Sequence, residues 1–333
     1  MTYDNIRLEK GLYTTGKSFT DALESMDPSE NYIGTSLEGL DAFQRQLKRF
    51  DIKVSGKNSD PIEKFFKTTD SAALFPEYIS RAVKQGIEEN DILSSIVAAT
   101  TQIDGLDYRA IAVGTEISAD EDLTVEEGAT IPETAVKTQE NLVTLHKRGR
   151  MLTASYEAIR FQRLDVFTIA LKQIGAAIAR AQIKDAVNVL INGDGNNNAA
   201  KQITTESGLT YNDIVNLWMS LYPYKMTTVL ASPSVLSKFL GLSEFKNSAS
   251  ASSFDYTGKL ITPFGAELVR CDHLEDGKMI ALDRNFALEK VHTGGITTEF
   301  DKLIDRQLER ASVTETAGFA KIFTEASAVM TVA

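Results

Sequence analysis

The residues most suggestive of chemistry lie near the start of the chain, in the run Gly11-Leu12-Tyr13-Thr14-Thr15-Gly16-Lys17-Ser18. This run matches the G-x-x-x-x-G-K-[ST] loop that cradles nucleotide phosphates. Such a loop follows a buried strand and precedes a helix whose N-terminal amides face the phosphates. Residues 5–10 are too charged for a central parallel strand, and a Walker-B-like run ending at Asp283 lies far along the chain. A P-loop nucleotide hydrolase is therefore kept only as the alternative from another class.

A second pattern, Asp194-Gly195-Asn196-Asn197-Asn198, begins like a calcium-binding loop. That loop needs a glycine at its sixth position and a bidentate glutamate at its twelfth. Ala199 and Thr205 occupy these positions here, so we interpret the run as a turn that closes a long helix.

The histidines and the cysteine do not form a reactive set. His146, His273 and His292 lack the spacing of metal ligands, and no G-x-S-x-G nucleophile elbow occurs. We interpret Asp272-His273 as a polar loop between strands. The single cysteine, Cys271, excludes an internal disulfide framework and is expected to be a small buried side chain. The sequence thus predicts no catalytic residue, no cofactor and no metal.

Composition narrows the class of protein. A chain of 333 residues can form two domains with a substantial core. No apolar run approaches the roughly 18 residues of a membrane span, and the N-terminus lacks the features of a secretory signal, so we expect no membrane association. The formal net charge of -11 opposes non-specific binding to nucleic acids.

Charge is distributed unevenly along the chain. Between Arg109 and Lys137 there are carboxylates and no basic residue: Glu116, Asp120, Glu121, Asp122, Glu126, Glu127 and Glu133. Residues 41–67 lean the other way, with Arg45, Lys48, Arg49, Lys53, Lys57, Lys64 and Lys67. Oppositely charged segments suit contacts between neighbouring copies of one chain. Two solvated faces that never meet are the alternative interpretation.

The elements before residue 74 are expected to be short. Thr35 and Glu38 form a predicted capping box, followed by Leu37, Leu40, Phe43, Leu47 and Phe50 at helical spacing. One face of this helix must therefore pack on something. Polar linker residues surround it, so residues 1–73 resemble an arm more than a domain.

The middle of the chain predicts a projecting hairpin and a rod. A helix begins at Pro76, with Ile79, Val83 and Ile87 on its apolar face. A strand near residues 107–113 leads to the acidic hairpin, and Lys147-Arg148-Gly149-Arg150 forms a basic hinge. A helix over 165–191, N-capped by Asp165, spans about 40 Å. A hairpin, a turn back and a rigid rod suit a protein that contacts copies of itself.

The last third of the chain alternates helices and strands. We predict helices over 211–221 and from Ser232, and strands at 227–231, 267–270 and 279–282. Together they form a compact α/β unit. Extended segments follow at 303–316 and 327–332, and no internal repeat occurs.

Six short stretches, in this order and spacing, carry a family resemblance: Leu74-Phe75-Pro76-Glu77; Glu127-Gly128-Ala129-Thr130-Ile131-Pro132-Glu133; Lys147-Arg148-Gly149-Arg150 leading into Thr153-Ala154-Ser155-Tyr156-Glu157; Asn192-Gly193-Asp194-Gly195; Ala231-Ser232-Pro233-Ser234; and Glu325-Ala326-Ser327-Ala328-Val329. Over residues 74–332 the chain resembles a tailed-bacteriophage major capsid protein of the Hong Kong 97 type.

The resemblance implies an α+β protein with the Hong Kong 97-like capsid fold. Its expected parts are an N-terminal arm (1–75), the leading helix and strand of a peripheral domain (76–107), an extended loop (108–146), the peripheral domain with its spine helix at 165–191 (147–204), an axial domain (205–299) and return strands of the peripheral domain (300–333).

The resemblance also implies a structural function rather than an enzyme. The chain would form hexamers and pentamers of an icosahedral shell around double-stranded DNA, with a scaffolding protein, a portal and a decoration protein as further partners. It would be found in the virion, and in the host cytoplasm during assembly. An encapsulin-like nanocompartment is the alternative within this fold, although the long arm before Leu74 favours the virus.

The expected intersubunit contacts are Glu126, Glu127 and Pro132 in the extended loop, Arg148 and Arg150 in the basic hinge, and Phe43 and Leu47 in the arm. Some members of this fold crosslink their subunits through a lysine in the extended loop. Gly128 occupies that position here, which implies a shell without isopeptide crosslinks.

Overall fold

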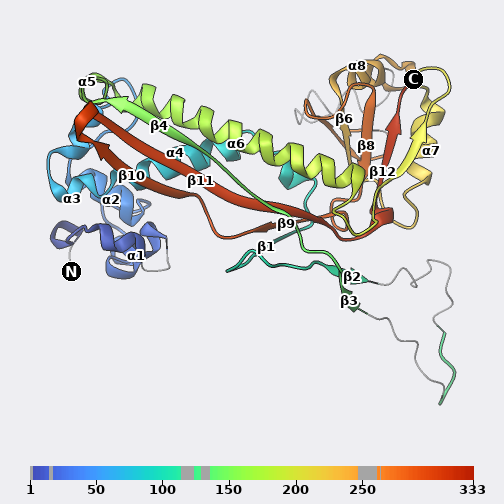
Figure 1. Cartoon of the computed structure of the whole chain (residues 1–333), viewed down its shortest axis with the longest axis horizontal. Coiled ribbons are helices and arrows are strands. Elements are labelled where there is room, and N and C mark those ends of the chain that lie inside the picture. Colours follow the sequence, from blue (N-terminus) through green and yellow to red (C-terminus); the bar gives the residue numbers. More distant parts are fainter. Residues whose placement is uncertain (1–2, 15–17, 114–123, 129–135, 247–260, 263) are drawn as a thin grey trace. The chain divides into compact units, whose positions relative to one another are not determined.

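The computed structural model describes residues 3–14, 18–113, 124–128, 136–246, 261–262 and 264–333 (Figure 1). The chain forms two compact units. The first unit comprises residues 1–90, 148–179 and 296–315, and the second comprises 91–147, 180–295 and 316–333. Helix α6 (Leu164–Asn192) and strand β11 (Leu308–Lys321) contribute residues to both units.

Helices α1 (Phe19–Met26), α2 (Ala42–Arg49) and α3 (Thr69–Ala72) form the start of the first unit. Helix α2 begins at a capping box made by Asp41 and Gln44, rather than at the predicted Thr35. Residues 35–40 form turns, in which the Glu38 carboxylate accepts a hydrogen bond from the Gly34 amide. Asp41 and Gln44 cap each other's backbone amides reciprocally, and the helix begins directly after Asp41.

The predicted N-terminal arm is a folded helical module in the structure. Its core includes Phe19, Leu23, Phe43 and Phe65, all buried. It also encloses an ion pair between Arg45 and Asp27, with the Nε–Oδ2 distance 2.7 Å and both side chains fully buried. The sequence underestimated this module because its apolar residues are spread over short helices and come together only in three dimensions.

Helices α4 (Phe75–Glu88) and α6 cross within the first unit at two glycines. A Cβ added at Gly86 would overlap the backbone of Lys172, and one added at Gly175 would overlap the carbonyl of Val83. The two backbones therefore approach more closely than side chains permit. The predicted apolar face of α4 is confirmed, since Ile79 and Val83 are buried.

Strand β4 (Leu145–Ser155) leads through α5 (Tyr156–Phe161) to α6 and pairs with β11, which also pairs antiparallel with β10 (Thr297–Leu303). The predicted basic hinge at Lys147-Arg148-Gly149-Arg150 is wrong, because these residues lie inside β4. Gly149 is needed there for close contact, since a Cβ would overlap the Val313 carbonyl.

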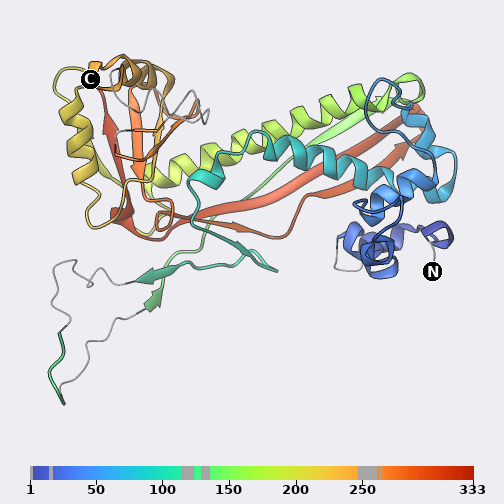
Figure 2. The same cartoon turned by 180° about the vertical axis from the view of Figure 1, so that it is seen from behind.

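A five-stranded sheet forms the centre of the second unit (Figure 2). Its order is β5 (Lys201–Thr204), β12 (Ser327–Thr331), β8 (Lys278–Leu282), β6 (Thr228–Ala231) and β7 (Glu267–Arg270). Strands β8 and β6 are antiparallel, as are β12 and β8, whereas β12–β5 and β6–β7 are parallel. The predicted strands at 227–231, 267–270 and 279–282 are confirmed. Strand β12 differs from expectation, because it completes this sheet rather than returning to a peripheral domain with residues 300–315.

Both faces of this sheet are covered. Ile214 of α7 (Tyr211–Met219) and Phe239 of α8 (Pro233–Gly241) pack with Val229 and Met330 on one face. Leu190 of α6 packs with residues of the opposite face. Alternate strand residues thus point to two cores, which explains why the strands are nearly continuous apolar runs. The short helix α9 (Ser243–Lys246) follows α8.

The remaining strands belong to the second unit. Strand β1 (Ala99–Gln102) is parallel to β9 (Leu288–His292), which is antiparallel to β11. Strands β2 (Ile111–Val113) and β3 (Val136–Thr138) form a separate two-stranded ribbon, shorter than the strand predicted at 107–113. Among the described residues, no helix combines the length and the hydropathy needed to cross a bilayer.

Candidate intersubunit contact surfaces

The segment predicted as the extended loop contains a ribbon with exposed apolar side chains. Among the described residues, strands β2 and β3 pair only with each other, in a register that sets Val113 opposite Val136 and Ile111 opposite Thr138. Ile111 is 50% exposed and Val136 is 65% exposed. An isolated two-stranded ribbon is marginally stable in water, and exposed apolar residues that cluster mark interaction surfaces. The exposed side chains of Ile111 and Val136 therefore mark this ribbon as a candidate contact surface.

The tip of this loop presents its acids to solvent. Residues 124–128 are all exposed, including the predicted contacts Glu126 and Glu127. Gly128 has a φ of +84°, a left-handed conformation that disfavours a lysine as well as any other side chain with a Cβ. The third predicted contact of the loop, Pro132, lies outside the described residues.

Hydrogen bonds hold the base of the loop to the turn after α6. The Asn141 amide donates to Asn196 Oδ1 at 2.8 Å, and Asn141 Nδ2 donates to the Gly195 carbonyl at 2.7 Å. Asn196 Nδ2 donates to Gln139 Oε1 at 2.9 Å. The sequence predicted a turn at 192–198 but missed this second role. The run of asparagines beside glycines was the available signal, because asparagine side chains bond readily to nearby backbone.

A buried lysine lies beside the same turn. Lys321 is fully buried; its Nζ lies 3.4 Å from the Leu190 carbonyl, and its backbone amide donates to Asp194 Oδ2 at 2.9 Å. Burial lowers the pKa of Lys321 to about 8, although Glu325 and Asp194 act in the opposite direction. A lysine at the last turn of α6 also complements the negative end of the helix dipole.

The other predicted contact residues fall into two groups. Arg150 is exposed on β4 and Arg148 is half-buried on the same strand. Phe43 and Leu47 are buried in the core of their own helical module. Their apolar face docks as predicted but on the same chain, so we do not carry these two side chains into the proposed intersubunit contacts.

The basic segment 41–67 is only partly neutralised within its own module. Arg45 pairs with Asp27, Lys64 Nζ lies 3.0 Å from Asp60 Oδ2, and the Arg49 guanidinium donates to the Ile6 carbonyl. Lys48, Lys53, Lys57 and Lys67 of this segment remain exposed to solvent.

The phosphate-loop match has no supporting context. Residues Tyr3–Asn5 and Lys10–Thr14 form 3-10 helices, so the described residues before the match contain no strand. Ser18 is the N-cap of α1 and accepts the Asp21 amide, while residues 15–17 lie outside the described residues. Asp283 accepts the Lys225 amide at 3.0 Å and serves a turn. The structure contradicts the P-loop alternative.

The calcium-like turn is occupied by its own hydrogen bonds. Asp194 Oδ1 accepts the Asn196 amide at 3.2 Å, and Oδ2 accepts the Lys321 amide.

His146 Nδ1 lies 3.1 Å from Asp185 Oδ2. Over the part of the chain that the structure describes, no three His, Cys, Asp or Glu side chains are arranged to hold a metal ion.

The model of a family described as phage capsid protein matches residues 138–320, more than half of the chain. The chain belongs to the phage capsid protein family. As a phage capsid protein, it serves a structural function in the shell of a virion. This confirms the main prediction over the encapsulin-like alternative.

Solved structures share the fold of this phage capsid protein. The capsid of a native GTA particle aligns with a TM-score of 0.54 and 14% identity, covering 72% of this chain and 90% of that one. A virus-like particle from Pyrococcus furiosus aligns with a TM-score of 0.51 and 14% identity, covering 76% and 98%. Mycobacterium phage Che8 gives a TM-score of 0.50 and 14% identity, covering 68% and 84%.

At this identity the structural likeness establishes the fold alone. The phage capsid protein has the Hong Kong 97-like capsid fold, as predicted. No curated protein sequence matches it.

Proposed function

We propose that this chain is the major capsid protein of a tailed bacteriophage, which assembles into hexamers and pentamers of an icosahedral shell around double-stranded DNA. The observation that carries the proposal is the β2–β3 ribbon. The base of the ribbon packs on its own chain through Ala110 and Val143, whereas Ile111 and Val136 stay exposed, so a neighbouring copy can bury these two side chains.

Charged residues add specificity to this contact. In the shell, the loop contacts one neighbouring copy through the predicted residues Glu126, Glu127 and Pro132. Strand β4 contacts another neighbouring copy through Arg148 and Arg150. Complementary charge directs which surfaces meet and disfavours wrong partners more than it adds affinity. Obligate interfaces of this kind bury more than roughly 2,000 Å² in total.

The further partners follow from the same function. A scaffolding protein directs assembly in the host cytoplasm, a portal occupies one vertex, and a decoration protein binds the finished shell. The net charge of -11 keeps the shell from adhering to packaged DNA, because DNA binding requires clustered cations. The chain supplies no catalytic group, and the shell forms without isopeptide crosslinks.

Electron microscopy of the purified chain, alone and with candidate scaffold, tests the proposal. We expect capsomers or closed shells. The double variant Ile111→Thr, Val136→Thr keeps β-branched residues in the ribbon but removes apolar surface, so it should fold and assemble poorly. Ile33→Thr, at an exposed position in the helical module, is the matched control and should assemble normally. A wild-type chain that stays a 36.5 kDa monomer under all these conditions would contradict the proposal.

A further inference from the structure

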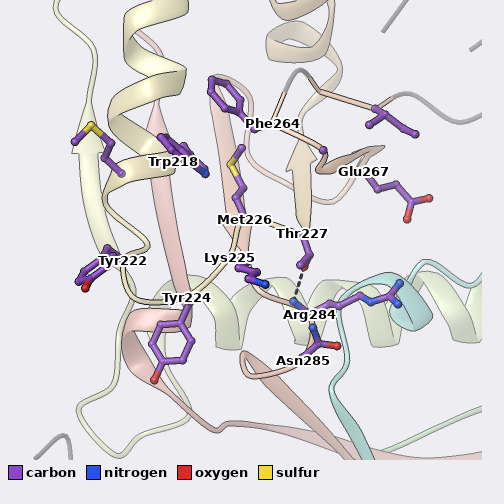
Figure 3. Close-up of a pocket in the computed structure, with 13 residues that line it drawn as sticks. Trp218, Tyr222, Tyr224, Lys225, Met226, Thr227, Phe264, Glu267, Arg284 and Asn285 are labelled. Atoms are coloured by element: carbon purple, nitrogen blue, oxygen red, sulfur yellow. Dashed lines mark hydrogen bonds between the residues drawn. The ribbon is translucent and has the colours of Figure 1, made fainter. Parts of the chain in front are cut away.

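The second unit contains a groove of about 820 Å³ beside the five-stranded sheet (Figure 3). It is lined by the end of α7, by the segment that leads into β6, by residues next to β7 and by Arg284 and Asn285. Met219 is 64% exposed and Tyr222 is 65% exposed at its wall. Binding pockets in proteins commonly have volumes of about 300–1,000 Å³, so this groove is large enough to hold a few side chains of a bound peptide.

The groove has an aromatic wall. Trp218 stacks on Phe264 with ring centroids 5.4 Å apart and an interplanar angle of 19°, and Phe264 stacks on Tyr211 at 5.9 Å. Met226 lies near Trp218 and Phe264 in Figure 3 and also lines the groove. The stacked rings provide a rigid apolar surface, and the flexible methionine thioether can adjust to the shape of a bound apolar side chain.

Cations lie at the other side of the groove, where Figure 3 shows Lys225 and Arg284 near Asn285. Within the described part of the chain, neither Lys225 nor Arg284 forms a side-chain hydrogen bond or ion pair, and both are exposed. The acid of the lining, Glu267, lies 3.4 Å from Ser95 Oγ. The groove therefore combines an apolar wall with net positive charge, which suits an acidic segment that carries an apolar residue.

We infer that this groove receives the tip of the extended loop, Thr124–Glu127, from a second copy of the chain. This inference rests on the proposed self-assembly through the extended loop and names its acceptor. Val125 would lie against Trp218 and Phe264, while the adjacent Glu126 and Glu127 would pair with Lys225 and Arg284. Val125, Glu126 and Glu127 are exposed.

The geometry of one chain points to a second copy as the source of the loop. No residue of the tip lines the groove of its own chain. A loop on one copy that fits a groove on the next is a head-to-tail contact, and repeated head-to-tail contacts form a ring when the rotation between copies closes. The groove differs from the exposed lysines of segment 41–67 in placing its cations beside an aromatic wall, which also accommodates Val125.

The single tryptophan of the chain, Trp218, reports on the groove directly. We expect its fluorescence emission to shift to shorter wavelength when wild-type subunits form capsomers, because the indole leaves water. The variant Val125→Ser should reduce this shift, since it removes the side chain that covers the ring. Circular dichroism confirms that each variant remains folded.

A charge exchange tests the pairing itself. Either double variant, Lys225→Glu with Arg284→Glu or Glu126→Lys with Glu127→Lys, should raise the concentration needed for assembly on the order of tenfold or more, because like charges then meet. The quadruple variant, which combines all four substitutions, restores opposite charges across the contact and should recover assembly. Lys201→Glu with Lys238→Glu, both exposed outside the groove, is the matched control and should assemble normally.

The fluorescence and charge-exchange experiments distinguish a failure of this inference from a failure of the proposed capsid function. Normal assembly of the groove variants, with Trp218 emission unchanged in assembled wild type, would overturn the inference and leave the capsid function intact. If both double variants assemble poorly and the quadruple variant assembles no better, the assigned pairing is also overturned. Wild type that never assembles contradicts the proposed function itself.

Discussion

At the scale of single residues, two buried cations behave differently. Arg45 is surrounded by partners: it pairs with Asp27, and its guanidinium lies 4.5 Å from the centre of the Tyr32 ring. Among the described residues, the ammonium group of Lys321 forms no ion pair; it lies 3.4 Å from the Leu190 carbonyl, and the effect of burial exceeds the attraction of Glu325 and Asp194. A buried charge is tolerated when it is paired, and an unpaired one favours its neutral form. Stability should therefore respond to pairing at Arg45 and to pH at Lys321.

Replacing Lys321 by methionine should reveal the cost of burying the charged lysine. The folded-state pKa of Lys321 is about 8, below its ordinary value of 10.5, so the unfolded chain binds more protons between these values. The stability of wild type relative to Lys321→Met is thus lowest below pH 8. It should rise between pH 8 and 10.5, by on the order of 3 kcal/mol in total.

Urea unfolding of unassembled wild type and Lys321→Met, at pH 7, 8, 9 and 10, measures this difference. Because both proteins share every other titrating group, the difference isolates Lys321. A constant gap across the pH range would show that Lys321 keeps its charge when folded.

Replacing Arg45 by methionine should destabilise the helical module strongly. The variant leaves the Asp27 carboxylate buried without its cation, a loss that costs about 3–5 kcal/mol. Lys84→Met is the control, because Lys84 and Glu88 form an exposed pair worth less than about 1 kcal/mol. Hydrogen exchange of α1 and α2 checks the prediction, and similar protection in both variants would refute it.

At the scale of elements, the contact between α4 and α6 depends on the absence of side chains. Gly86→Ala and Gly175→Ala each place a methyl group where backbone atoms already lie. Each should cost about 1–3 kcal/mol, despite the higher helix propensity of alanine. Gly241→Ala, at the end of α8 with open space around it, should be neutral or slightly stabilising. Thermal unfolding of the three variants decides between these expectations.

The long helix shows what a sequence pattern can determine. The predicted range, 165–191, lies within one residue of α6 at both ends, because a long apolar pattern ends at Asn192-Gly193. The strands of the α/β unit were predicted for the same reason, since buried runs such as Thr228–Ala231 are bounded by polar residues.

Other features depended on partners far along the chain. Gly149 looked like a hinge, but the residue that explains it is Val313. Arg45 looked like surface charge, although Asp27 and Ser29 enclose it. The groove was missed because Trp218, Lys225, Phe264 and Arg284 share no local spacing. Contacts of this kind are set by tertiary structure and leave no periodic signal.

At the scale of the whole molecule, the conformation of Gly128 bears on the finished shell. A lysine at this position would adopt a left-handed φ at an energetic cost, so crosslinking chemistry is disfavoured by backbone as well as by composition. Denaturing gels of mature particles should therefore show one band at 36.5 kDa. A ladder of covalent multimers would refute this prediction.

Strand β12 lies between β5 and β8, yet it is the last of the five strands of its sheet in chain order. A ribosome delivers the chain at about 5–20 residues per second, so β8 emerges several seconds before the strand that pairs with it. Until then, β5 lacks its partner and β8 has an open edge. A subunit without β12 consequently has no finished five-stranded sheet. Because β12 joins β5 to β8, the sheet can close only after the last of its strands has left the ribosome.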